Sequence, residues 1–190
     1  MKYNAFVDVE GNLASELGFL AKAVSEVKTR YLMNHIRLEP SYKGEGLLGV
    51  ATDGKHLHLV DPLGKAATDV FGMTPGYWQV MRSYKHQERI WLARIDDSCV
   101  DWEYPNWQKV IPTGEVAYKT TFNGFKFKHV GSNRLVKLFR GFPEATAVNL
   151  SYLQSLGTLY EWAVDWYGPD KALKFTNNNR MALIMPLQMD

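Results

Sequence analysis

The chain has 190 residues, of which 46% are hydrophobic and 13% aromatic, and its formal net charge is +2. This composition excludes a disordered chain, and the length suffices for one domain with its own core, or at most for two small ones. A single cysteine, Cys99, excludes an internal disulfide framework and predicts a cytoplasmic location. No stretch approaches the about 18 apolar residues of a membrane span, and Met1–Phe6 lacks the apolar run of a signal peptide, so we expect no membrane partner.

The first predicted unit, residues 1–64, consists of a strand, a helix and further strands. Asn12 is predicted to cap a helix whose apolar residues recur at helical spacing as far as Val27. The turn Asp53-Gly54 is predicted to join the last two strands, because Gly accepts a positive φ and Asp caps its own turn. The segment Asp61-Pro62-Leu63-Gly64 is predicted to end the unit. Strands are predicted at 5–9, 33–38, 47–50 and 57–60.

Residues 65–143 are predicted to be β-rich, without a long helix. Between Tyr104 and Phe142 a single acid, Glu115, stands among aromatic and basic residues. Cations that hold phosphates and aromatics that stack on bases are typical of a nucleic-acid surface, and a solvated hairpin over a core has the same composition. Both interpretations stay open. The basic residues are Lys109, Lys119, Lys126, Lys128, Arg134, Lys137 and Arg140. Strands are predicted at 77–81, 89–95, 116–121 and 124–130.

The opening pattern returns in residues 144–190. After a strand at 145–148, Asn149 or Ser151 caps a helix that is predicted to run to Tyr167 and to end at Gly168-Pro169. Strands at 172–176 and 181–187 then pair across three asparagines. We therefore predict an α+β fold, one domain over 1–190, with halves 1–64 and 144–190 and a β-rich basic insertion at 65–143.

Four segments, in this order along the chain, resemble motifs of the bacterial DNA sliding clamps, the beta subunits of replicative DNA polymerase. Ala51–Leu57 is similar to that family's Ala-Thr-Asp-Gly-(basic)-x-Leu segment. Tyr104–Pro112 is similar to its aromatic-Pro-(Asp/Asn)-aromatic segment that ends in Leu/Ile-Pro. Val148–Leu153 and Met181–Met189 are similar to the start of a helix in the last clamp domain and to the clamp's terminal segment. The chain thus resembles a single-domain relative of these clamps.

The resemblance implies a function without catalysis and without a cofactor. In the family these segments surround one hydrophobic cleft, which receives peptides of the Gln-Leu-x-Leu-Phe type from polymerases and other replication or repair proteins. A DNA replication accessory factor, acting as a clamp-like processivity factor with DNA as a further partner, is the function implied. The peptide contacts implied are Thr52, Gly54, Lys55, His56, Leu57, Pro112, Asn149, Tyr152, Leu183, Met185, Pro186 and Leu187.

Two features depart from the family pattern. Clamps have three domains per chain and close into rings of six, so a single-domain chain would need about six copies, and a homo-oligomer stays open. The predicted second helix, 149–167, has no Lys or Arg and carries Glu161 and Asp165, a charge that repels phosphates.

Two alternatives from other classes remain. A nucleic-acid-binding protein would use the basic stretch 104–142, with Lys119, Lys126, Lys128, Arg134, Lys137 and Arg140 on the phosphates. A metal-dependent nuclease would hold Mg²⁺ at the acidic cluster Asp96, Asp97 and Asp101. Asp53, His56 and His58 lie close in sequence but lack a further ligand at metal-binding spacing, so we expect no metal there and no enzyme.

Overall fold

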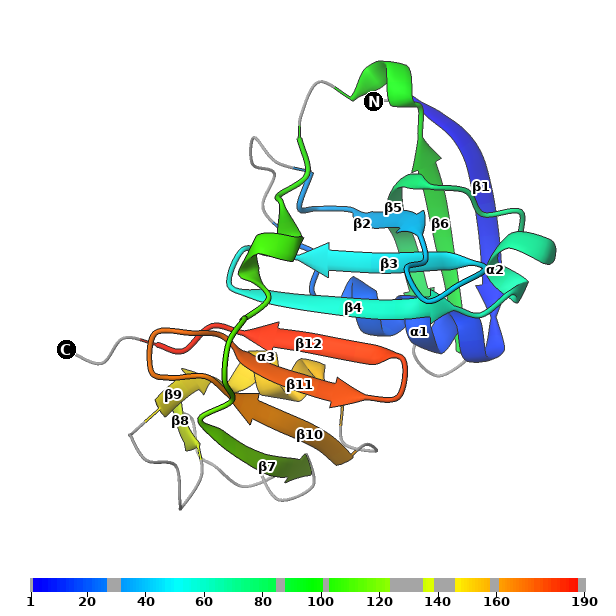
Figure 1. Ribbon diagram of the computed structural model, residues 1–190. Helices are drawn as coiled ribbons and strands as arrows, with labels where there is room; N and C mark the ends of the chain where they lie inside the picture. The colour runs from blue at the N-terminus through cyan, green and yellow to red at the C-terminus, as the bar shows by residue number, and fades with distance from the viewer. Residues whose placement is uncertain are drawn as a thin grey trace. The chain divides into compact units, whose positions relative to one another are not determined.

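The computed structural model divides the chain into two compact units, Met1–Pro105 and Asn106–Asp190. Both contain antiparallel strands and a helix, which confirms the predicted α+β class (Figure 1). The boundary between the two units, after Pro105, falls inside the predicted β-rich insertion at 65–143. The structure describes residues 2–26, 32–84, 88–100, 103–123, 135–138, 146–157 and 161–187.

The first unit is an antiparallel sheet in the strand order β1-β6-β5-β2-β3-β4, with helix α1 packed against β1, β3, β4 and β6 (Figure 1). Residues 76–84 and 89–95 therefore complete this sheet as β5 and β6. The elements are β1 (Tyr3–Glu10), α1 (Gly11–Ala21), β2 (Ile36–Pro40), β3 (Leu47–Thr52), β4 (His56–Leu63), α2 (Ala66–Asp69), β5 (Gly76–Tyr84), β6 (Arg89–Ile95) and the 3-10 turn η1 (Asp97–Cys99).

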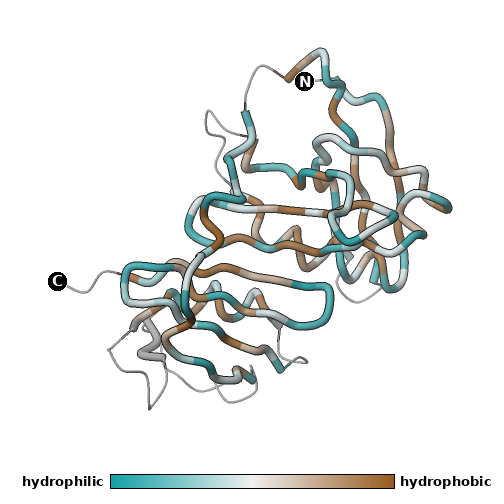
Figure 2. The backbone as a smooth tube through the Cα atoms, in the orientation of Figure 1, coloured by the Kyte–Doolittle hydropathy of each residue, from teal (hydrophilic) through white to brown (hydrophobic). Residues whose placement is uncertain are grey.

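Helix α1 lies close to β3 because a glycine faces it. Leu13, Leu17 and Leu20 form its buried stripe, as their spacing predicts. A Cβ added at Gly49 in β3 would lie 2.5 Å from Leu20 Cδ1, so the absence of a side chain there permits the contact. The hydrophobic colouring of α1, β3 and β4 in Figure 2 marks this core. The helix ends at Ala21, earlier than predicted.

Strand β4 ends at Leu63, within the segment Asp61–Gly64 that was predicted to end the unit, but three residues later than the strand predicted at 57–60. The β3–β4 register is irregular between Leu47 and Gly49, opposite this stretch. Proline has no N–H to donate, and an irregular register leaves a place where no ladder bond is required. Pro62 is therefore accommodated inside the strand.

The second unit has the antiparallel strand order β7-β10-β11-β12 and a separate strand pair, β8–β9. Strands β11 and β12 pair across the three asparagines, as predicted. Asn178 in this turn has a φ of +51°, and the turn is hydrophilic in Figure 2. The elements are η2 (Trp107–Val110), β7 (Tyr118–Asn123), β8 (Leu135–Leu138), β9 (Thr146–Asn149), α3 (Leu150–Ser155), β10 (Glu161–Trp166), β11 (Leu173–Asn177) and β12 (Arg180–Ile184).

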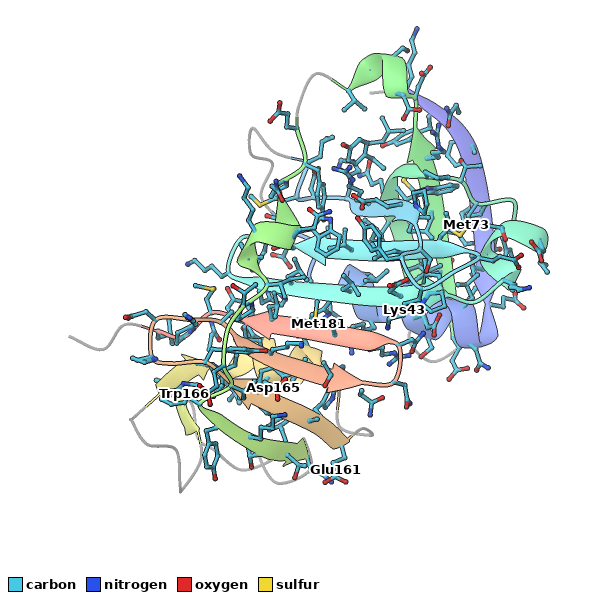
Figure 3. All side chains as sticks on the ribbon, viewed as in Figure 1. Lys43, Met73, Glu161, Asp165, Trp166 and Met181 are labelled. Atoms are coloured by element: carbon cyan, nitrogen blue, oxygen red, sulfur yellow. The ribbon has the colours of Figure 1, made fainter. Side chains whose placement is uncertain are left out.

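The long helix predicted to reach Tyr167 is wrong. Helix α3 ends at Ser155, before Gly157 at a φ of +85°. The following segment is strand β10, in which Trp162, Val164 and Trp166 are buried. Glu161 and Asp165, labelled with Trp166 in Figure 3, lie on this strand. The charge argument made for a second helix therefore does not apply, since α3 itself carries no charged residue.

The two units repeat one topology, each with a strand, a helix and a three-strand meander. In the first unit β1 and α1 precede β2-β3-β4, and in the second β9 and α3 precede β10-β11-β12. The additional strands also pair alike, because β5 joins β2 and β6 joins β1, while β7 joins β10 and β8 joins β9. They follow the meander in the first unit and precede the helix in the second. No helix within the described residues is long and apolar enough to cross a membrane.

Candidate functional site: an apolar groove and a braced hairpin

The β3–β4 hairpin has the tight turn that its sequence predicts. Asp53 Oδ1 accepts hydrogen bonds from the amides of Lys55 and His56, both at 2.8 Å. Thr52 Oγ1 donates to the carbonyl of His56 at 2.7 Å and accepts from the amide of Gly54 at 3.0 Å. Gly54 has a φ of +89°, a backbone conformation that favours glycine. These side chains therefore fix the turn itself.

Two histidines of β4 connect the hairpin to the end of helix α1. His56 Nδ1 lies 2.9 Å from Asp53 Oδ1, and its Nε2 lies 3.3 Å from the carbonyl oxygen of Lys22. His58 Nδ1 lies 2.7 Å from the carbonyl oxygen of Phe19, and its ring stacks on the Phe19 ring. Carbonyls at a helix C-terminus lack partners inside the helix, so the two imidazoles brace that end.

The electrostatics agree with a structural role for this cluster. Burial lowers the pKa of His58 to about 3, so the ring is neutral at pH 7. Burial alone would raise the pKa of Asp53, but hydrogen bonds from the His56 side chain and from two amides lower it to about 2. In the part of the chain that the structure describes, no group of three or more His, Cys, Asp or Glu side chains is placed to hold a metal ion.

In the second unit, Pro112 and Met185 line one groove of about 290 Å³, whose lining is part apolar and part polar. Both were predicted peptide contacts, from segments far apart in sequence. Leu173 at the start of β11 pairs with Ile184 at the end of β12, so Ala172 and Met185 leave the sheet side by side. We call this the Met185 groove, lined by Lys109, Val110, Ile111, Pro112, Thr113, Asp170, Lys171, Ala172 and Met185.

Sequence reasoning missed most of the groove's lining. Val110 and Ile111 belong to the segment Tyr104–Pro112 that resembles a clamp motif, and this membership was the sequence signal that could have identified them. Asp170 and Lys171 belong to the turn before β11, whose Gly168-Pro169 start was interpreted only as the end of a helix. Only the fold brings this turn to the groove.

The remaining predicted residues of the second unit have other surroundings. Leu183 is 2% exposed and belongs to the core. Asn149 caps α3, with its Oδ1 accepting hydrogen bonds from the Ser151 amide and hydroxyl. The amide of Leu187 donates to the carbonyl of Ala147 at 2.8 Å, which joins the end of the described chain to β9. Tyr152 lies on α3, and Pro186 follows Met185.

The acidic cluster is engaged in local contacts. Asp96 caps η1, because its Oδ1 accepts hydrogen bonds from the Ser98 amide at 3.0 Å and the Ser98 hydroxyl at 2.8 Å. These bonds lower the pKa of Asp96. Asp97 forms an ion pair with Arg94 at 2.7 Å. Asp101 lies outside the described residues. The two described acids thus stabilise a turn.

Few of the predicted nucleic-acid contacts fall on described side chains. Lys119 is exposed on β7, where it lies opposite Asp165 in the register with β10. Lys137 lies on β8. Lys126, Lys128, Arg134 and Arg140 lie outside the described residues, so the nucleic-acid surface stays a prediction.

Solved structures of bacterial sliding clamps match the chain over its length, although no protein-family profile and no curated protein sequence matches it. The Bartonella birtlesii clamp (DNA polymerase III subunit beta), bound to griselimycin, has a TM-score of 0.64 at 17% identity, over 100% of this chain and 67% of that one. The Caulobacter crescentus beta clamp has a TM-score of 0.62 at 16% identity, over 98% and 66%. The Helicobacter pylori beta clamp, bound to a DNA ligase peptide, has a TM-score of 0.57 at 14% identity, over 100% and 67%.

This likeness concerns the fold. The chain has the α+β fold of the sliding clamps and resembles them along its whole length, as the four sequence motifs predicted. It spans about two thirds of the length of those clamps.

Proposed function

We propose that this protein is a non-catalytic, clamp-like accessory factor of DNA replication that docks partner peptides in the Met185 groove. The single observation that carries this proposal is the groove itself. It is lined by both Pro112 and Met185, two residues that the resemblance to the clamps assigns to a peptide cleft. A cytoplasmic location goes with this function.

The chemistry of the groove suits an extended peptide with large apolar side chains. Met185 is 41% exposed and Val110 50% exposed, so each has apolar surface that a ligand would remove from water. Methionine adapts its shape to different partners, and Pro112 gives the wall a fixed backbone. The sliding-clamp fold supports the same proposal by analogy, since the Helicobacter pylori clamp was solved with a DNA ligase peptide.

Peptide binding is tested by the fluorescence anisotropy of a labelled Gln-Leu-Ser-Leu-Phe peptide titrated with the protein. Met185→Ala removes apolar contact area and should weaken binding about tenfold. Met81→Ala is the matched control, because Met81 is also exposed, at 47%, but lies on β5 of the first unit. Equal affinities of Met185→Ala and Met81→Ala, or no binding by the unmodified protein, would contradict the proposal.

The five predicted contacts of the β3–β4 hairpin stay predictions. The exposed Lys55 at the turn is accessible to a ligand, whereas Thr52, His56 and Leu57 are buried and hold the hairpin. Lys55→Ala is therefore the informative variant there, because it leaves the bonds of Thr52 and Asp53 intact. Weaker binding of the labelled peptide by Lys55→Ala would support a contact at this turn.

A further inference from the structure

The rim of the Met185 groove carries an excess of positive charge. Lys109 comes from η2 and Lys171 from the turn before β11, and both side chains are exposed. Asp170 is the acid of the lining. Across the described part of the chain, lysine ion pairs are made by Lys65 and Lys174, and none by either rim lysine. Both ammonium groups are thus available to a ligand.

The groove is small and its lining is only partly apolar. Val110, Ile111, Pro112, Ala172 and Met185 provide the apolar part. The volume of the whole groove, about 290 Å³, lies just below the about 300–1,000 Å³ of ligand pockets. The groove therefore accommodates one or two apolar side chains of a peptide, while the neighbouring residues of that peptide lie on the rim. The residues beside the apolar anchor are the ones that meet Lys109 and Lys171.

We propose that the Met185 groove selects peptides in which Asp or Glu lies next to the apolar anchor, with Lys109 and Lys171 as the specificity-determining residues. The inference rests on the proposed peptide docking and adds the chemistry of the partner. A carboxylate beside the anchor meets two cations that make no ion pair with any described residue. The anchor removes water from the adjoining surface, which strengthens this attraction. A phosphate backbone would meet the same cations but would leave the apolar side chains of the groove unused.

The experiment compares two matched pairs of labelled, C-terminally amidated peptides. Gln-Leu-Ser-Leu-Phe-Asp-Glu is titrated beside Gln-Leu-Ser-Leu-Phe-Asn-Gln, and Asp-Glu-Gln-Leu-Ser-Leu-Phe beside Asn-Gln-Gln-Leu-Ser-Leu-Phe, so that acids on either side of the anchor are sampled. At low ionic strength we expect an acidic peptide to bind about three- to tenfold more tightly than its amide counterpart. The double variant Lys109→Gln/Lys171→Gln should abolish that difference. Lys65→Gln, an exposed lysine of the first unit, should preserve it.

Each outcome separates this inference from the proposed function. If all four peptides bind equally and Met185→Ala weakens them all, the docking proposal holds and the charge selection is overturned. If none binds, both fall together. If a labelled single-stranded oligonucleotide binds, depends on Lys109 and Lys171, and displaces no peptide, the rim serves nucleic acid and the acidic-peptide inference is overturned.

Discussion

His58 shows at the scale of one residue how the hairpin cluster depends on pH. Burial lowers the pKa of His58 from an ordinary 6.5 to about 3. Between these two pH values the imidazole is therefore neutral in the folded protein and protonated in the unfolded chain. Between pH 6.5 and 3 the unfolded state therefore binds more protons, and the free energy of unfolding falls as the pH falls, by at most about 1.4 kcal/mol per pH unit. Above pH 6.5 the contribution is complete.

His58→Gln tests this assignment, because glutamine keeps an N–H donor for the carbonyl of Phe19 and does not titrate. Urea unfolding at pH 7, 5.5 and 4.5 should show a shallower pH dependence for the variant than for the unmodified protein. Asp53→Asn is the control, since the pKa of Asp53 is lowered to about 2 and its contribution is lost only below about pH 4. An unchanged slope in His58→Gln would show that another group titrates there.

Gly49 and Gly18 form a matched pair of glycines, one inside the contact between β3 and α1 and one in α1 outside it. Gly49→Ala places a Cβ 2.5 Å from Leu20 Cδ1 and 3.2 Å from Leu63 Cδ1, so we expect a loss of about 1–3 kcal/mol of stability. Gly18 lies within α1 with no atom within 4 Å of an added Cβ, so Gly18→Ala should stabilise the helix by about 0.5–1 kcal/mol. Thermal or urea unfolding measures both, and shifts of the same sign would contradict this packing.

At the scale of elements, strand β10 explains why the helical pattern failed. The apolar residues Leu153, Leu156, Tyr160, Val164 and Tyr167 recur at helical spacing, and this spacing predicted one helix. Trp162, Val164 and Trp166 are buried together, and only a two-residue period puts all three on one face. Gly157 ends the helix at a left-handed backbone position, and that signal was outweighed by the apolar spacing.

Trp162→Asp and Ala163→Asp distinguish the two interpretations of this segment. In strand β10 a charge at Trp162 enters the core and should abolish cooperative unfolding, whereas Ala163 is exposed and tolerates a charge with little loss. On the predicted helix, whose apolar stripe includes Val164, Trp162 would lie on the opposite, solvated face and the order of the two variants would reverse. Circular dichroism with thermal unfolding reads out both variants.

The elements that local sequence predicted well are those with local causes. The Asp53-Gly54 turn, the cap at Asn149 and the β11–β12 hairpin each depend on residues a few positions apart. The pairing of β1 with β6 joins residues 79 to 92 positions apart, and no local pattern encodes it. The groove shows the same limit. Pro112 and Met185 lie in family motifs, so the sequence alone predicted them as peptide contacts. Lys171 lies in no such motif, and only the fold places it in the groove lining.

At the scale of the whole molecule, the chain holds two units of similar topology and spans about two thirds of a clamp chain. If each unit takes the place of one clamp domain, a ring of six requires three copies in place of the six inferred for a single domain. We therefore expect any closed assembly to have a mass of about 65 kDa, three times the chain mass of 21.7 kDa.

Light scattering during size-exclusion chromatography, with and without DNA, measures that mass. A species near 65 kDa would support a ring of two-unit chains, and one near six chain masses would support a single domain per chain. A monomer that DNA does not change would exclude a ring under these conditions. It would leave the peptide groove untouched, because all its lining residues belong to one unit.

The central claim, peptide docking in the Met185 groove, is tested most directly by methionine-methyl NMR. With 13C-labelled methionine methyl groups, the Met185 signal is identified by its absence in Met185→Leu. Adding the Gln-Leu-Ser-Leu-Phe peptide should shift the Met185 signal, while the buried Met73 and the exposed Met81, both in the first unit, stay unchanged. A shift confined to Met185 is the predicted result. Saturating peptide that leaves Met185 unshifted, or that shifts Met81 in its place, would contradict the account.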